Sequence, residues 1–154
     1  MKQIAGRPIE RIRVFVDPLA IRLAGKTTAA TPYEGKFSLA FTTALSLTGR
    51  SAAQADFTDS TVKDAALQSV LPKVVLVPVS DMALTAATLE VDLQDGTALR
   101  AHTPLALGNP GRAMNWDDMQ AKFMSLAEPV IGSVRSMPHS TSWQRYCRKS
   151  RLAM

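Results

Sequence analysis

Lys36 and Ser38 offer the clearest chemistry in this sequence, because both stand at the predicted start of an amphipathic helix. Backbone N–H groups at a helix N-terminus attract anions, and an adjacent lysine adds a positive charge. The pair could therefore help to bind an anionic ligand. From the residue types alone, however, a solvated lysine and a helix-capping serine are the preferred interpretation.

The histidines and the cysteine do not form a recognisable catalytic or metal-binding pattern. His102 and His139 are the two histidines, and Cys147 is the single cysteine. His102 falls on the polar face of a predicted strand, in the same register as Arg100, which favours a solvated surface histidine. These positions have no metal-ligand spacing. Nucleophile-elbow, Walker and Rossmann motifs are absent as well, and we expect neither a metal site nor a cofactor.

The composition is typical of a soluble globular protein with one domain. Hydrophobic residues make up 46% and charged residues 20% of the 154 residues, which is enough for one hydrophobic core. No apolar run approaches the roughly 18 residues of a membrane-spanning helix. The charged N-terminus lacks the apolar centre of a secretory signal, and one cysteine cannot form an internal disulfide. We expect a cytoplasmic protein without a membrane partner.

The positive net charge comes entirely from the end of the chain. The sequence has 18 Lys+Arg and 13 Asp+Glu residues, for a formal charge of +5. Five of the basic residues and none of the acids lie in residues 135–154. This basic, atypical C-terminal tail is short and carries no nucleic-acid-binding motif. We therefore assign the folded domain to residues 1–134 and expect no nucleic-acid partner.

Hydrophobic patterns predict three strand regions. Residues 9–16 alternate between apolar and polar side chains from Arg11 onward, which predicts a half-buried strand. Residues 74–79 are a β-branched run, which Pro78 restricts to a sheet edge or a strand end. Residues 88–93 and 99–103 alternate on either side of an Asp-Gly turn and predict a β-hairpin.

The first predicted helix has two alternative starts. Thr31 could cap it, with Pro32 in the first turn and Glu34 completing a capping box, and Ser38 is the rival cap. Gly49 supplies its C-terminal stop. In either case four apolar residues fall on one helix face: Phe37, Phe41, Ala44 and Leu45.

Two further helices complete the prediction. The second follows Thr58 or Asp59 and ends at Pro72; its inward residues are Val62, Ala66 and Val70. The third is capped by Asn115, and its apolar residues are Met119, Phe123 and Leu126. Asp117 and Asp118 in its first turn are expected to complement the helix dipole rather than act as a catalytic pair. The fold class is therefore α+β, an antiparallel-rich sheet with packed helices.

Four segments, in this order, resemble the second and smaller domain of the MmgE/PrpD family. They are IERIRVFVDPLAIRL, EGKFSLAFTTALSLTGR, FTDSTVKD with the hairpin after it, and GNPGRAMNWDDMQAKFMSLAEPVIG. The resemblance covers roughly residues 7–134. The family includes 2-methylcitrate dehydratase, cis-aconitate decarboxylase and iminodisuccinate epimerase. Its members are cofactor-independent lyases or isomerases that move a proton beside a carboxylate of small di- and tricarboxylic acids.

The resemblance implies a site between two domains, to which the small domain contributes the KFS segment. Lys36, Ser38 and Phe41 then become candidate substrate-binding residues, and this chain carries no catalytic residue. Several family members have a tyrosine at the position of Phe41. Phenylalanine can neither donate nor accept a proton, which argues against a direct transfer of the dehydratase or decarboxylase activity.

The resemblance also implies that the larger helical domain is missing from this chain. We therefore expect the chain alone to be inactive, and to bind that helical domain or self-associate, with a dimer as the expected form. Phe37 and Phe41 are candidates for the centre of the interface; the competing interpretation is that both are ordinary core residues. The alternative function is a non-catalytic binding or oligomerisation module.

Overall fold

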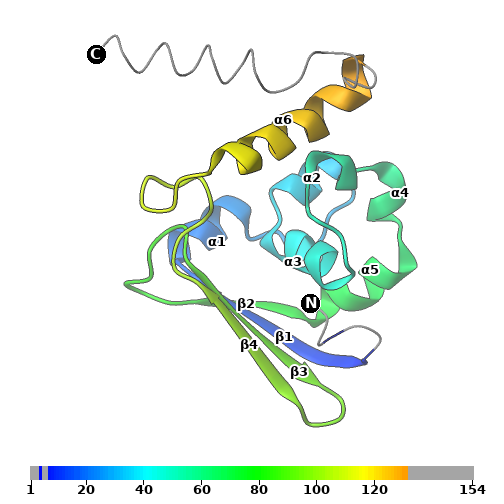
Figure 1. Ribbon diagram of the computed structural model, residues 1–154. Coiled ribbons are helices and arrows are strands. Elements are labelled where there is room, and N and C mark those ends of the chain that lie inside the picture. Colours follow the sequence, from blue (N-terminus) through cyan, green and yellow to red (C-terminus); the bar gives the residue numbers. More distant parts are fainter. Residues whose placement is uncertain (1–3, 5–6, 132–154) are drawn as a thin grey trace. The chain divides into compact units, whose positions relative to one another are not determined.

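The computed structural model describes residue 4 and residues 7–131, in two compact units that divide after Met114. The described part of the first unit holds a sheet and the helices α1 to α5, whereas that of the second holds α6 (Figure 1). The tail assigned to residues 135–154 lies outside the described residues. In the described part of the chain, no helix is long and apolar enough to cross a membrane.

The sheet has four strands in the spatial order β2-β1-β3-β4. They are β1 (Ile9–Val16), β2 (Val74–Pro78), β3 (Ala87–Leu93) and β4 (Ala98–Thr103). The predicted strands and the hairpin are confirmed, and the Pro78 strand does lie at an edge. The sheet is mixed, because β1 pairs parallel with β2 and antiparallel with β3. A parallel pair requires a long crossover, and α1 to α5 lie in that connection.

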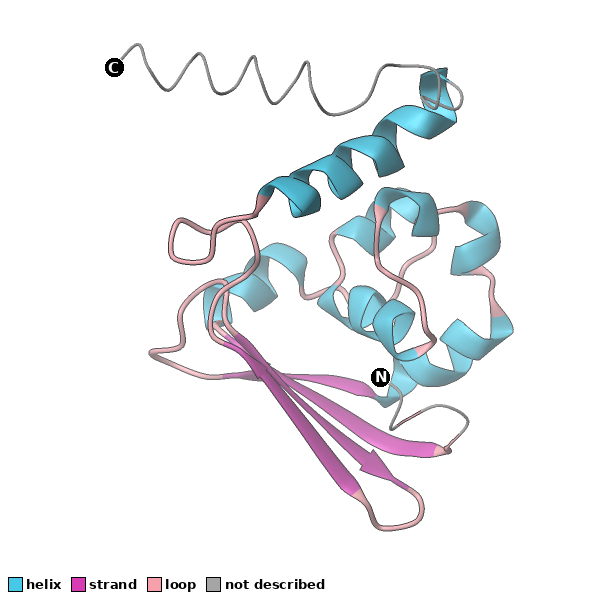
Figure 2. Cartoon of the chain, viewed as in Figure 1, coloured by secondary structure: helices cyan, strands magenta, loops and turns pink. Residues whose placement is uncertain are grey.

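Within the first unit, the hydrophobic core lies between the sheet and the helices α1 to α5, which cover one side of the sheet (Figure 2). In β1 the alternation places Ile12, Val14 and Val16 in the core. The intervening Arg13 pairs on the opposite face with Asp92 of β3, at 2.9 Å. Period-two alternation of this kind gives a sheet one buried and one charged face.

The first predicted helix is in fact two helices, because both alternative caps are used. Thr31 Oγ1 accepts a hydrogen bond from the Glu34 backbone N–H and begins α2 (Pro32–Lys36). Ser38 Oγ accepts from the Phe41 N–H and begins α3 (Leu39–Leu47). Gly49, with a φ of +86°, follows the end of α3 as predicted.

A short helix after β1 was not predicted. Asp17 accepts a hydrogen bond from the Leu19 N–H at 2.6 Å and caps α1 (Pro18–Ala24), with Pro18 in the first turn. None of the α1 residues is buried. Ala20 and Ile21 nevertheless pack against the core. With seven residues, of which only Arg22 is polar, the segment is too short and too uniformly apolar to show a helical period, so its hydrophobic pattern gave no signal.

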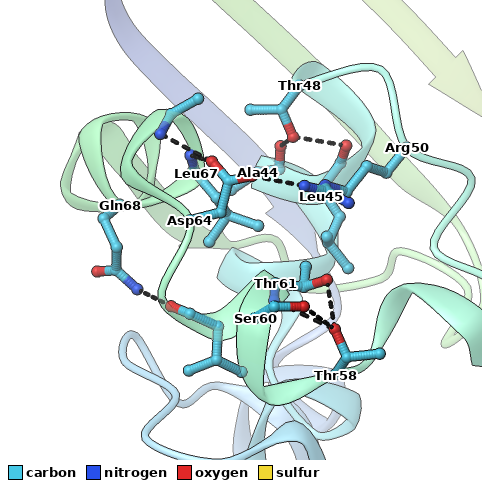
Figure 3. Close-up of polar contacts among 12 residues, drawn as sticks. Ala44, Leu45, Thr48, Arg50, Thr58, Ser60, Thr61, Asp64, Leu67 and Gln68 are labelled. Carbon is cyan, nitrogen blue, oxygen red and sulfur yellow. Dashed lines mark hydrogen bonds and ion pairs between the residues drawn. The ribbon is translucent and has the colours of Figure 1, made fainter.

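The second predicted helix also divides, into α4 (Asp59–Val62) and α5 (Ala65–Val70). Thr58 caps α4 and Asp64 caps α5, as the close-up shows (Figure 3). The new cap restarts the helical period, so Leu67 is buried and Ala66 is exposed. The predicted inward position of Ala66 was wrong for this reason.

Asp64 also ties α5 to the end of α3. One carboxylate oxygen accepts from the Ala66 and Leu67 N–H groups at 2.9 and 3.3 Å. The other accepts from the Arg50 guanidinium at 2.5 Å (Figure 3). Hydrogen bonds from Leu67 and Arg50 hold the pKa of Asp64 below its ordinary value.

The second unit contains α6 (Trp116–Ile131), which confirms the third predicted helix. Asn115 Oδ1 accepts from the Asp118 N–H at 2.8 Å, and Asp118 Oδ2 accepts from the Asn115 N–H at 3.0 Å. This reciprocal capping box gives Asp118 a structural role. Met119, Phe123 and Leu126 recur at helical spacing along α6.

The hairpin turn supports a pH prediction. Asp95 accepts hydrogen bonds from the Arg7 guanidinium and from the Thr97 N–H, the latter at 3.0 Å. These bonds lower the pKa of Asp95 to about 2. Because the pKa is lower in the folded state, Asp95 stabilises the fold above pH ~4 and loses that contribution as the pH falls toward the folded value.

We expect NMR titration of the Asp95 carboxyl carbon to give a pKa of about 2. An Arg7→Ala substitution should return it toward the ordinary value of about 3.9. Arg11→Ala serves as the control and should leave the pKa of Asp95 unchanged. An ordinary pKa in the unsubstituted protein would contradict the pairing.

Candidate functional site

The candidate site is the α2–α3 junction, by which we mean residues 33–41. It contains all three predicted substrate-binding residues. Lys36 is the last residue of α2, Phe37 is the C-cap and Ser38 is the N-cap of α3. Two capped helices that meet within three residues fix the backbone of this segment closely. The direction in which each Cα–Cβ bond leaves the backbone at the junction is therefore set by the fold.

Ser38 points into the protein. Its side chain is buried, with 1% of the residue exposed. Ser38 Oγ donates to the Lys26 carbonyl oxygen at 2.5 Å and accepts from the Phe41 N–H at 3.0 Å. The hydroxyl proton is thus engaged within the fold, and Ser38 fastens the start of α3 to the loop at Lys26.

Phe41 is also inside, in the hydrophobic core, with no exposed surface. Its ring lies against Gly35 of α2, where an added Cβ would come within 2.9 Å of two ring carbons. The Phe57 ring is a second neighbour, with its centroid 6.1 Å from that of Phe41 and one ring carbon 3.4 Å from the same added Cβ. Phe41 therefore acts as the packing centre between α2, α3 and the segment that holds Phe57.

Lys36 is the exposed member of the trio. Its ammonium group lies 6.0 Å from the centroid of the Phe57 ring, near the outer limit of a cation–π contact. Phe57 in turn packs on the core. The arrangement places a positive charge at the surface directly above an aromatic ring that the core supports.

The surface beside Lys36 is aromatic. Tyr33 is 70% and Phe37 48% exposed, and their ring centroids are 5.2 Å apart. The sequence prediction grouped Phe37 with Phe41 on one helix face. That was wrong, because the helix break at Ser38 separates them and leaves Phe37 outside the core. Lys36, Tyr33 and Phe37 together offer one cation and two partly exposed rings.

Glu34 is the acid nearest to this cation along the chain, and its charge is already engaged. Its carboxylate accepts from Lys26 Nζ at 2.9 Å and from the Ala30 N–H at 2.8 Å. The Lys26 hydrogen bond is the main reason why the pKa of Glu34 lies below its ordinary value. Glu34 therefore stays ionised near neutral pH without neutralising Lys36.

The other polar candidates lie on different parts of the molecule. His102 is exposed on β4, and its Nδ1 is 2.8 Å from Thr88 Oγ1 across the hairpin. The predicted surface position of His102 is confirmed. Within the described residues, no group of three or more His, Cys, Asp or Glu side chains could hold a metal ion.

Residues 2–138 match the family model described as the MmgE/PrpD C-terminal domain. The chain belongs to the MmgE/PrpD family. The match spans both the sheet and the α2–α3 junction, so the suspected family and the suspected domain are confirmed together. A comparison with curated proteins finds no match.

Two residues of this MmgE/PrpD domain were missed by sequence reasoning. Lys26 lies between the first predicted strand and the first predicted helix, and Phe57 is the first residue of the FTDSTVKD stretch. Both reach the junction through tertiary contacts. For Phe57 a positional signal was available, because it directly precedes the cap Thr58 and a hydrophobic residue at that position often packs against the helix that follows.

Replacement of Ser38 tests how firmly the junction is held. Ser38→Ala removes the α3 cap and leaves the Lys26 carbonyl without its donor, and should lower the free energy of unfolding by about 1–2 kcal/mol. Urea denaturation measures this change. Ser69→Ala is the matched control, because Ser69 bonds locally on an exposed helix surface, and its effect should stay within about 0.5 kcal/mol. Equal effects of the two substitutions would contradict the role of Ser38.

Proposed function

We propose that this chain is the small domain of a cofactor-independent lyase or isomerase that acts on a small di- or tricarboxylic acid. The reaction is proton abstraction next to a carboxylate. The observation that carries the proposal is the exposed Lys36 ammonium above Phe57, at the junction that the family resemblance assigns to the substrate cleft. A fixed cation of this kind suits a carboxylate ligand.

In this proposal the three candidate residues have different roles. Lys36 contacts a substrate carboxylate and offsets negative charge that develops on the substrate. Ser38 and Phe41 shape the site from beneath, because the hydroxyl of Ser38 is engaged internally and the ring of Phe41 is buried. The exposed rings of Tyr33 and Phe37 line the edge of the site.

The proposed enzyme needs a second domain for its chemistry. Abstraction of a proton from a weak carbon acid requires a positioned base within hydrogen-bond reach and a site closed to water. We assign the base to the helical domain of the family, and therefore expect this chain alone to be inactive. We place the complete enzyme in the cytoplasm. The Phe41 position lacks the tyrosine hydroxyl of several relatives, which argues against a direct transfer of their reactions to this chain.

A second candidate is a non-catalytic binding or oligomerisation module, for example a dimer. The observation that favours it is the exposed Tyr33–Phe37 pair, whose rings are in tilted contact, since exposed aromatic residues are enriched at protein interfaces. Both candidates use the same surface. They differ in whether Lys36 or the aromatic pair contributes most of the binding free energy.

Lys36→Ala distinguishes the two functions. The chain is combined with a separately produced helical domain of an MmgE/PrpD protein, and turnover of methylcitrate, cis-aconitate and iminodisuccinate is measured. The loss of one charge-assisted hydrogen bond should lower kcat/KM roughly ten-fold or more. Lys63→Ala, at an exposed lysine at the end of α4, is the control and should leave kcat/KM unchanged.

Two other outcomes of this experiment would change the interpretation. Turnover that is equal in the Lys36→Ala and the unsubstituted protein would contradict the assigned role of Lys36. A complex that forms, catalyses no reaction and is broken by Phe37→Ala but not by Lys36→Ala would support the binding module instead.

A further inference from the structure

Lys26 makes two contacts with the junction, one at each end of residues 34–38. Its side-chain Nζ donates to Glu34 Oε1 at 2.9 Å. Its backbone carbonyl oxygen accepts from Ser38 Oγ at 2.5 Å. The adjacent Gly25 also forms an isolated antiparallel bridge with Ser38. Lys26 thus connects the loop to both α2 and the start of α3.

The segment needs such ties because α2 is only five residues long. Helices this short are not stable by themselves, since the first turn costs more conformational entropy than its hydrogen bonds return. The end of α2 that carries Lys36 is held by capping and tertiary contacts instead. Of these, Glu34 is tied to the loop by the Lys26 side chain and the Ala30 N–H.

We propose that Lys26 is a positioning residue for Lys36: through Glu34 it fixes the orientation in which α2 presents the Lys36 ammonium to a carboxylate ligand. This inference rests on the proposed function, which makes Lys36 the group that binds the ligand. Lys26 itself does not contact the ligand in this scheme.

The two ties can be separated by mutation. Lys26→Met removes the ammonium and its bond to Glu34, whereas the backbone bond from Ser38 stays. Lys26→Arg keeps both a positive charge and a donor for Glu34. Because Lys26 is 58% exposed in its side chain, neither substitution creates a buried cavity, and both proteins should fold normally.

The test is an NMR titration of the full chain with citrate as the carboxylate probe, followed through the backbone amide signals of Lys36 and Phe37. We expect Lys26→Met to weaken citrate binding about three- to five-fold, as expected for the loss of an exposed ion pair. Lys26→Arg should restore affinity to within about two-fold, and Lys63→Met, the matched control, should leave it unchanged. The thermal midpoint of Lys26→Met should stay close to that of the unsubstituted chain.

Each other outcome overturns a specific claim. If Lys36→Ala abolishes the citrate response and Lys26→Met leaves it unchanged, the positioning role falls and the proposed function stands. If Lys36→Ala binds citrate like the unsubstituted chain, or that chain gives no response at the junction, the proposed function falls and the positioning role with it. If Lys26→Met lowers the thermal midpoint but leaves the citrate affinity of the folded protein unchanged, Lys26 has only a structural role and the positioning role falls.

Discussion

The contact between the Phe41 ring and the backbone of Gly35 is the constraint on which the α2–α3 junction depends. A Cβ on residue 35 would lie 2.9 Å from two carbons of that ring, and the ring itself has no exposed surface and cannot move aside. Only glycine lets the two helices approach this closely. The approach brings the end of α2 down onto the core and determines where the next residue, Lys36, emerges.

The same constraint explains why some residues of the junction are buried and others are exposed. Gly35, Ser38 and Phe41 face inward and use their packing or hydrogen bonds within the fold. Lys36 and Phe37 face outward, and the Phe57 ring lies between the cation and the core. The domain can therefore present a charged group above a supported ring without burying it, and so avoids the desolvation cost of a buried ion.

Local sequence signals predicted the elements that local chemistry determines. The strands followed from alternation or, for β2, from a β-branched run, and the hairpin followed from its Asp-Gly turn. The starts of α2 and α3 followed from Thr31 and Ser38. The side chains that were placed wrongly lie where a cap interrupts a predicted helix. Periodicity carried across Ser38 grouped Phe37 with Phe41, and carried across Asp64 it placed Ala66 inside. A break at a cap resets the helical phase, and the apolar pattern alone does not reveal it.

Contacts between distant segments could not be predicted from these local sequence patterns. The parallel pairing of β1 with β2 and the approach of Lys26 and Phe57 to the junction depend on how the helices pack. The candidate residues Lys36 and Ser38 could be located at a helix start from the sequence, and family resemblance gave them a possible role. Which of them reaches the surface is decided by the Gly35–Phe41 contact.

The most direct test of this account is the unfolding free energy of Gly35→Ala, measured by urea denaturation alone and together with Phe41→Leu. Within a helix, alanine is normally better than glycine by about 0.5–1 kcal/mol. The close contact predicts the opposite sign, a loss of about 1–3 kcal/mol from overpacking. The loss should shrink when Phe41→Leu makes room. A Gly35→Ala protein that is more stable than the unsubstituted chain would contradict the central claim.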